Sequence, residues 1–277
     1  MKKLIVNADD LGQSRSINKG IADCHRFGIV TSASLMVNMQ DSVDAVRLLK
    51  SIPNIGIGLH LNLTFGPPVS SPQEIGSLVG ENGQFIGGTR VLSLHPDLRK
   101  SEGIQKVVDL MLEDFHKTVS KRDIETEMLA QFHRFMKLVG RLPTHIDTHH
   151  HIHQLPEVLH HIITLAKDND IPVRQIDPNM VKILRKSSIR TTDYFFDTMI
   201  IEANRRRSHS LYLNEIISSL KDGTTEVLCH PGYSNEKLRK QTLYSNQREV
   251  ELECLCDSLL MKRIKDEGVQ LITYDEL

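Results

Sequence analysis

The chain has 277 residues, enough for one large domain or two modest ones with a substantial buried core. It carries 34 Lys and Arg against 35 Asp and Glu, so no excess of one sign favours nucleic acid or an acidic membrane as a partner. No stretch approaches the roughly 20 apolar residues of a membrane span, and the start lacks the long apolar region of a signal peptide. The four cysteines form no CxxC pair, which is typical of reduced thiols. We therefore expect a cytoplasmic protein with no nucleic-acid and no membrane partner.

Short runs rich in β-branched residues alternate with longer segments of helical period along the first quarter of the chain. Strands are predicted over residues 2–8, 29–37 and 56–63. Between them the apolar spacing predicts a helix over 16–27, closed by Gly28, and a helix over 41–50, capped by Asp41.

Residues 66–101 break this rhythm with many prolines and glycines, which is typical of a lid or a binding loop. Regular alternation then resumes. Helices are predicted over 102–120, 123–139, 156–168, 211–221 and 243–267. Strands are predicted over 144–148, 171–176, 225–232 and 269–274. Residues 178–208 are expected to form a second irregular excursion.

Repeated strand–helix alternation predicts parallel strands with helices outside them, an α/β fold. About seven strands in a chain of this length favour a closed or nearly closed (β/α) barrel over an open doubly wound sheet. Neither a GxGxxG nor a GxxxxGK[ST] loop argues for a nucleotide-binding fold. We predict a single domain over 1–277, with a lid or insertion at about 66–120.

Polar residues gather at the predicted carboxyl ends of the strands, where a barrel builds its active site. They are Asp9, Asp10, His60, Asn62, Asp147, His149 and His230. Because they come from four separate strands and meet at one predicted rim, they indicate a catalytic site.

Side-chain alternation along the strands refines this prediction. In GIGLHLNL (56–63), the even-numbered residues, including His60, share the face that must point into the barrel. In THIDTHHHIH (144–153), the odd-numbered residues share one face. His149 can therefore meet His60 inside the mouth of the barrel, whereas His150 should point away.

The adjacent Asp9 and Asp10 would face opposite ways on a regular strand. We expect them to lie where the first strand runs into its loop, a turn that Gly12 makes possible. There one carboxylate can bind a metal ion while its neighbour accepts a proton.

Two imidazoles and a carboxylate with open positions form a common site for a catalytic divalent ion. The alternatives are a solvated histidine patch, a hydrogen-bonded strand-end histidine and an aspartate pair that caps a helix. Each of these alternatives explains the polar residues of one segment only, whereas a metal site explains the residues of all three segments together. The metal site is therefore favoured. For His230 two roles stay open: a ring held by a backbone carbonyl, or a general acid.

Five stretches carry a resemblance to a known family: IVNADDLG, GIVTSASLMVN, GLHLNLT, PTHIDTHHHIH and CHPGY. In this order they resemble the YdjC/ChbG family of carbohydrate deacetylases. Leu11 departs from the phenylalanine usual in that family. The resemblance implies a distorted (β/α) TIM-like barrel similar to that of polysaccharide deacetylases. It also implies hydrolysis of the N-acetyl group of a small amino sugar from chitin degradation, such as chitobiose or its 6-phosphate.

The resemblance also assigns roles to individual residues. It implies a metal ion on Asp10, His60 and His149, with Asp9 as general base and His230 as general acid. The family is usually described with Mg²⁺, whereas two imidazoles and one carboxylate suit Zn²⁺ or Co²⁺ by their softness.

Candidate sugar contacts lie near these residues, although each could equally support the site or pack within it. They are Asn62, His151, His153 and Arg174. Arg174 suits a substrate phosphate. Asp147 is a candidate to orient a ligand imidazole.

Two other functions stay open from the sequence. A metal-dependent phosphoesterase or other amidohydrolase could use the same barrel, and a second ion on Asp147 and His151 would favour it. A non-catalytic metal- or sugar-binding protein would keep its function without Asp9. A homodimer through the segment 102–120 is also expected.

Overall fold

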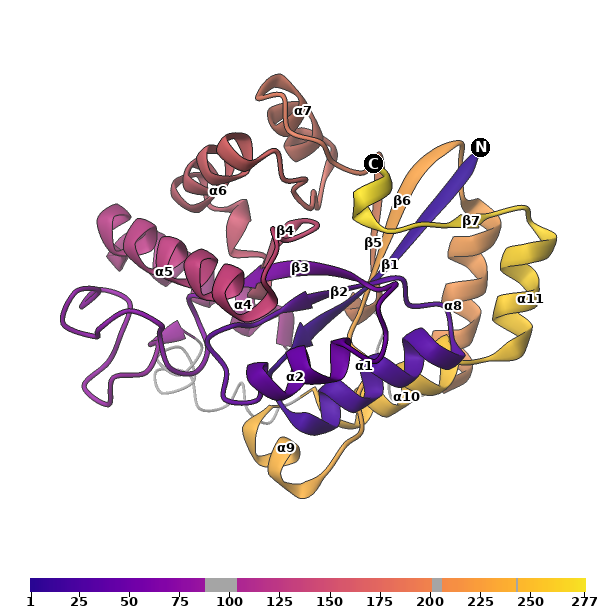
Figure 1. Ribbon diagram of the computed structural model, residues 1–277, viewed down its shortest axis with the longest axis horizontal. Coiled ribbons are helices and arrows are strands. Elements are labelled where there is room, and N and C mark those ends of the chain that lie inside the picture. Colours follow the sequence, from indigo (N-terminus) through magenta and orange to yellow (C-terminus); the bar gives the residue numbers. More distant parts are fainter. Residues whose placement is uncertain (88–103, 201–205, 243) are drawn as a thin grey trace.

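The computed structural model describes residues 1–87, 104–200, 206–242 and 244–277, and its centre is a parallel β-sheet (Figure 1). The strands run in the order β4-β3-β2-β1-β6-β5, and β7 pairs with the start of β1. Their bounds are β1 (Lys2–Leu11), β2 (Ser32–Leu35), β3 (Gly56–Leu61), β4 (Ile146–Thr148), β5 (Tyr194–Asp197), β6 (Gly223–Cys229) and β7 (Gln270–Leu271).

The sheet curls into a distorted barrel, and the gap between its two edge strands, β4 and β5, is closed irregularly. Val173 makes a single parallel bridge to Ile146, and its N–H donates to the carbonyl of Arg190 at 3.0 Å. Residues 193–197 then pair with β6. The distorted (β/α) barrel is confirmed, but the strand predicted over 171–176 is wrong, because only Val173 forms a bridge there.

Helices cover the outside of this sheet, with α1, α2 and α10 on one side and α5 and α6 on the other (Figure 1). The longer ones are α1 (Arg15–Phe27), α4 (Ile104–Thr118), α5 (Lys121–Val139), α6 (Pro156–Asn169), α8 (Arg206–Ser219) and α10 (Asn246–Leu255). The shorter ones are α2 (Ser42–Leu49), α7 (Pro178–Lys186), α9 (Glu236–Gln241) and α11 (Ser258–Asp266). Three 3₁₀ turns complete the described chain: η2 (His149–Gln154), η3 (Thr198–Ile200) and η4 (Tyr274–Glu276).

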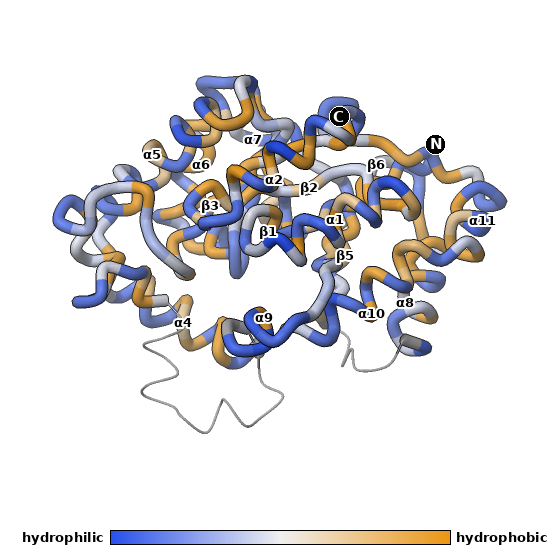
Figure 2. The backbone as a smooth tube through the Cα atoms, turned by 60° about the horizontal axis from the view of Figure 1, so that its bottom comes forward, coloured by the Kyte–Doolittle hydropathy of each residue, from blue (hydrophilic) through white to orange (hydrophobic). Residues whose placement is uncertain are grey.

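The core lies between the strands and these helices. Outward-facing strand residues such as Leu4, Ala33 and Leu59 are fully buried, because parallel strands covered by helices lose water on both faces. Along the outer helices the backbone alternates between hydrophilic and hydrophobic (Figure 2). Helix α1 begins after Ser14, whose side chain accepts the N–H of Ile17.

Several predicted elements differ from the structure. The helix predicted over 243–267 is divided, because the side chain of Asp257 accepts the N–H of Leu259 and starts α11 as a new helix. Asp41 precedes α2 but its side chain makes no capping bond. The irregular excursion at 178–208 contains α7 and β5, and its residues 201–205 lie outside the described part.

The expected lid at 66–120 is described only in part, since residues 88–103 lie outside the described ranges. Before that gap, Val69 and Ser70 donate their N–H groups to the buried carboxylate of Glu127 on α5. After it, Met111 and Phe115 of α4 are buried in the core. A lid function and a dimer interface here stay predictions. Among the described helices, none combines the length and apolarity needed to cross a membrane.

Candidate active site

A bulge in β1 turns two neighbouring aspartates toward the same site. The pairing of β1 with β2 shifts between Ala8 and Leu11, and Asp10 has a left-handed φ of 67°. In a regular strand Asp9 and Asp10 would face opposite sides, and a bulge removes this constraint at a backbone cost that is typical of functional sites. The expected strand–loop junction is therefore wrong in detail: both residues lie within β1.

His60 on β3 and Asp147 on β4 are neighbours across the sheet, and both point into the barrel. His60 Nδ1 donates to Asp147 Oδ1 at 2.8 Å. Because the carboxylate only accepts, Nδ1 carries a proton, and Nε2 is the nitrogen that an ion would bind after its own proton has left. Nε2 faces Asp10 Oδ1 at 3.5 Å. Asp147 therefore orients His60 so that Nε2 faces Asp10, an arrangement in which carboxylates support histidine ligands in many metal sites.

His149 reaches the same point although the strand that precedes it has ended. Strand β4 stops at Thr148, and His150 and His151 have φ of 56° and 51° in the turn η2. His149 Nδ1 lies 3.1 Å from Asp10 Oδ1. His150 does not point away as expected: its ring packs 3.9 Å from the His149 ring, and its Nδ1 lies 2.9 Å from Thr64 Oγ1.

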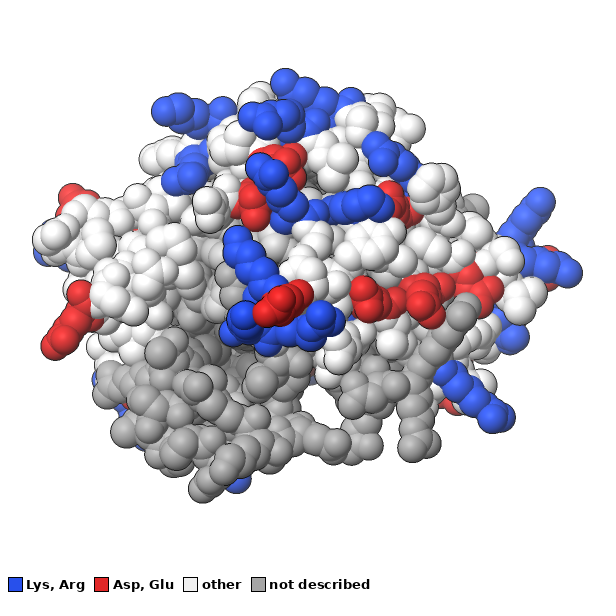
Figure 3. Space-filling model, turned by 90° about the horizontal axis from the view of Figure 1, so that it is seen from below, with Lys and Arg blue, Asp and Glu red and all other residues white. Residues whose placement is uncertain are grey.

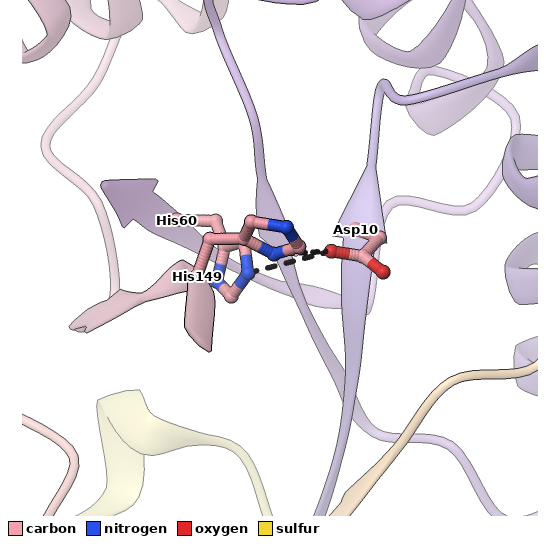
Figure 4. A group of neighbouring side chains, drawn as sticks. All are labelled: Asp10, His60 and His149. Carbon is pink, nitrogen blue, oxygen red and sulfur yellow. Dashed lines mark ion pairs between the residues drawn. The ribbon is translucent and has the colours of Figure 1, made fainter. Parts of the chain in front are cut away.

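Three ligand atoms thus converge on one point: Asp10 Oδ1, His60 Nε2 and His149 Nδ1, all within 4.8 Å of one another (Figure 4). Asp10 Oδ1 is buried and has no hydrogen-bond partner among the described residues. A buried oxygen without a donor is costly unless a cation satisfies it. The donor set therefore fits a divalent ion with open positions, and the two nitrogens favour Zn²⁺ or Co²⁺ over Mg²⁺.

The electrostatics of these ligands also suit a cation. Despite burial, the Arg248 guanidinium holds the pKa of Asp10 well below its usual range. Burial lowers the pKa of His149, so its ring is neutral. Burial also opposes protonation of His60, but the carboxylates of Asp147 and Asp9 prevail and raise its pKa to about 10. An ion that binds His60 must displace that proton.

Directly beneath these ligands, Arg174 occupies the barrel interior and is fully buried. It donates to both oxygens of Asp9, at 2.7 and 2.8 Å, and its Nη1 also lies 2.8 Å from Asp147 Oδ2. Its Nε donates to Glu226 Oε1 at 2.8 Å, and the Tyr274 hydroxyl donates to the other Glu226 oxygen. Arg174 is thus enclosed by three carboxylates, and the expectation that it contacts sugar or phosphate is wrong.

Two further expected sugar contacts are also enclosed. Asn62 accepts the N–H groups of Thr64 and Phe65 and donates to the Phe65 carbonyl, so it shapes the turn after β3. His153 is fully buried, and its Nδ1 lies 2.6 Å from Thr148 Oγ1. Of the four candidates, His151 alone keeps substantial exposure, at 24 %, with its Nε2 3.5 Å from Asp197 Oδ2.

His230 lies just beyond β6, the strand that pairs with β1 and so ends beside the aspartates. It is 7 % exposed, its N–H donates to Glu251 Oε2, and its Nδ1 has no hydrogen-bond partner among the described residues. No described carbonyl holds this nitrogen. The charge of His230 also adds to the effect of burial in lowering the pKa of His149.

The structure adds four charged residues that the sequence analysis did not select: Asp197, Glu226, Arg248 and Glu251. Glu226 had a signal, since a charge inside the apolar strand TEVLC must face the barrel interior. Nothing in the sequence pointed to Arg248 or Glu251, because charged residues on a helix are usually exposed to solvent.

Comparison with known proteins identifies the family. The family described as YdjC-like protein matches residues 3–266. The chain belongs to the YdjC-like family. This confirms the resemblance that the five motifs indicated.

Named members of the YdjC-like family align along nearly the whole chain. A carbohydrate deacetylase of Geobacillus stearothermophilus is 37 % identical over 274 residues, covering 98 % of this chain and 96 % of that protein. A chitooligosaccharide deacetylase of Proteus mirabilis is 33 % identical, covering 99 % and 98 %. A crystal structure from Enterococcus faecalis V583, described provisionally as a cellobiose-phosphate cleavage protein, superposes with a TM-score of 0.81 at 27 % identity, covering 99 % and 98 %.

Proposed function

We propose that this protein is a metal-dependent deacetylase that removes the N-acetyl group from a small acetylated amino sugar and releases acetate. The names of its relatives support the reaction. The observation that carries the metal dependence is the convergence of Asp10, His60 and His149 around a buried oxygen that lacks a donor.

The proposed chemistry divides between the ion and two side chains, Asp9 and His230. A divalent ion held by the three ligands would polarise the amide carbonyl and make water more acidic. Asp9, whose Oδ2 lies 3.9 Å from His60 Nε2, accepts the proton of the attacking water. His230, with its unpartnered Nδ1, donates a proton to the amine nitrogen as the C–N bond breaks. The products are acetate and the free amino sugar.

The positions of the charges favour a neutral sugar. Arg174, which the sequence suggested as a contact for a substrate phosphate, is fully buried and cannot reach one. On the described part of the face in Figure 3, acidic side chains stand among the basic ones, an arrangement that suits a small sugar more than a polyanion. We therefore propose an N-acetylated chitooligosaccharide such as chitobiose as the substrate, with its 6-phosphate as the comparison.

Two arguments bear on the identity of the ion, and they point to different ions. The family resemblance implies Mg²⁺, whereas the two imidazole nitrogens favour Zn²⁺ or Co²⁺. Reconstitution with each ion in turn decides between them.

The role of Asp9 is tested by Asp9→Asn. Acetate release from chitobiose should fall by about 10²- to 10⁴-fold, the usual contribution of a general base. Ion binding, measured by competition with a chromophoric chelator, should stay within a few-fold of wild type, because Asp9 is not a ligand. Asp222→Asn, which removes an exposed carboxylate paired with the N-terminus, serves as the control. Undiminished acetate release by Asp9→Asn would contradict the assignment and indicate a different base.

The phosphoesterase and binding-protein alternatives lack comparable support. A second ion would use Asp9, His60 and Asp147, but Arg174 already engages both oxygens of Asp9 and one of Asp147. A binding protein gives no reason for Asp9 and His230 to lie at neighbouring strand ends beside the three ligands.

A further inference from the structure

Arg248 lies against the proposed metal ligand Asp10, although it comes from the distant helix α10. Its Nη2 donates to Asp10 Oδ2 at 2.5 Å and to Gln13 Oε1 at 3.3 Å. Its Nε donates to the backbone carbonyl of Tyr244 at 3.0 Å. The side chain is 3 % exposed, so this guanidinium is fixed by burial and by three acceptors.

Two arginines hold the two neighbouring aspartates in different ways. Arg174 engages both oxygens of Asp9. Arg248 engages only Oδ2 of Asp10, and Oδ1 is left without a donor, 3.1 Å from His149 Nδ1. A carboxylate oxygen can bind an ion only through a lone pair that no other group occupies. Oδ1 of Asp10 is therefore the carboxylate oxygen without a donor, whereas both oxygens of Asp9 already accept hydrogen bonds.

We infer that Arg248 is a positioning residue that makes Asp10 a single-oxygen ligand of the ion. By occupying Oδ2, it fixes the plane of the carboxylate and directs Oδ1 toward the two imidazoles. This inference deepens the proposed function and rests on the ion that the function requires.

The backbone of Arg248 also anchors the segment that carries the proposed general acid. The N–H of Gly232, two residues after His230, donates to the Arg248 carbonyl at 3.2 Å. A Cβ on Gly232 would lie 3.4 Å from Arg248 Cδ and 3.3 Å from the Cα of Ile17. The glycine in CHPG thus lets the segment pass between α1 and α10. Arg248 thereby contacts both the proposed metal ligand Asp10 and the segment that follows the proposed proton donor.

The test compares Arg248→Met and Arg248→Lys with wild type and with Arg263→Met. Arg263, on α11, donates to Ser218 at 2.7 Å and lies away from the rim, so it controls for loss of a guanidinium contact between helices. Dissociation constants for Zn²⁺ and Co²⁺ are measured by chelator competition, and folding is checked by circular dichroism. We expect Arg248→Met to weaken ion binding by about 10- to 100-fold, the usual effect of removing a group that supports a ligand.

Arg248→Lys keeps the charge but lacks the planar guanidinium with its fixed donors, so we expect a loss of ion affinity between those of wild type and Arg248→Met. The visible spectrum of bound Co²⁺ should change in Arg248→Met, because Asp10 is then free to coordinate through both oxygens. Folded Arg248 variants that bind Co²⁺ with the affinity and spectrum of wild type would overturn the inference about Arg248 alone. Wild-type protein that binds an ion through Asp10 but releases no acetate would overturn the proposed reaction and leave the inference about Arg248 standing.

Discussion

The rim of the barrel and the layer directly beneath it use the same residue types in opposite ways. At the rim, Asp10, His60 and His149 converge on one point, and Asp10 Oδ1 has no hydrogen-bond partner among the described residues. One layer below, Arg174 sits among three carboxylates that neutralise it. The rim therefore fits a cation, whereas the inner layer already contains one, the Arg174 guanidinium.

The difference shows how the inner layer can hold the rim side chains in place for an ion. The paired inner layer fixes Asp9 and Asp147, and Asp147 in turn orients His60. An ion at the rim then meets ligands whose positions are already set, which lowers the cost of binding.

Removing a ligand from the rim should have the largest effect on activity. Asp10→Asn deletes the one anionic ligand, so we expect ion affinity to fall by more than about 100-fold, beyond the loss typical of a supporting residue. Acetate release should fall to background at ion concentrations that saturate wild type. Both are measured in parallel by chelator competition and an acetate assay. Normal ion binding by Asp10→Asn would show that the ion lies elsewhere.

Removing the cation of the inner layer should instead destabilise the fold. Arg174→Met leaves Asp9, Asp147 and Glu226 without their shared partner, and breaking a buried ion pair costs about 3–5 kcal/mol. Urea unfolding measures this loss. Arg185→Met removes an exposed pair with Asp193 and should change the free energy of unfolding by less than about 1 kcal/mol. Equal losses in both variants would contradict the contrast between rim and inner layer.

A smaller loss of unfolding free energy is expected when one carboxylate of the inner layer, Glu226, is replaced. This carboxyl is buried, and burial raises its pKa although Arg174 acts against the rise. Glu226→Gln keeps the shape and leaves Arg174 with two other carboxylates, so we expect a loss of about 1–3 kcal/mol, much less than for Arg174→Met. Because Glu226 acts on Asp9 through Arg174, turnover should decrease while ion affinity stays unchanged. A weakened ion affinity would argue against this separation.

The smallest predicted effect concerns pH. His145 stacks on Tyr274 at 3.9 Å, and burial lowers its pKa from 6.5 to about 4. The unfolded state then binds a proton that the folded state excludes, so stability is complete above pH 6.5 and is lost as pH falls toward 4. Between pH 7 and 5 this group accounts for about 2 kcal/mol of that loss. His145→Gln should reduce the decrease in unfolding free energy over that interval. An unchanged decrease would contradict the neutral state of His145.

The positions of the site residues could be predicted well from the sequence where simple geometry applies. Strand alternation places His60 inside the barrel, and pairing with β4 brings Asp147 beside it. The rule that strand ends meet at one rim brings His149 and His230 to the same place, although η2 breaks the alternation assumed for His149 and His150.

The charge partners could not be predicted in the same way. The sequence predicts Arg174 within a strand over 171–176 and as a contact for sugar or phosphate, but the barrel closes irregularly at Val173 and encloses it. Arg248 lies on an ordinary charged helix, and its contact with Asp10 spans 238 residues of sequence. Such pairings depend on how helices dock against the sheet, which local periodicity does not determine.

The most direct test of the account is to follow acetate release from chitobiose while ion-stripped wild-type protein is titrated with Zn²⁺, Co²⁺ or Mg²⁺. The account predicts no acetate without an ion and a rise that saturates at one ion per chain, since the described rim offers one free set of ligands. Acetate release by the stripped protein, or activity that requires two ions per chain, would contradict it.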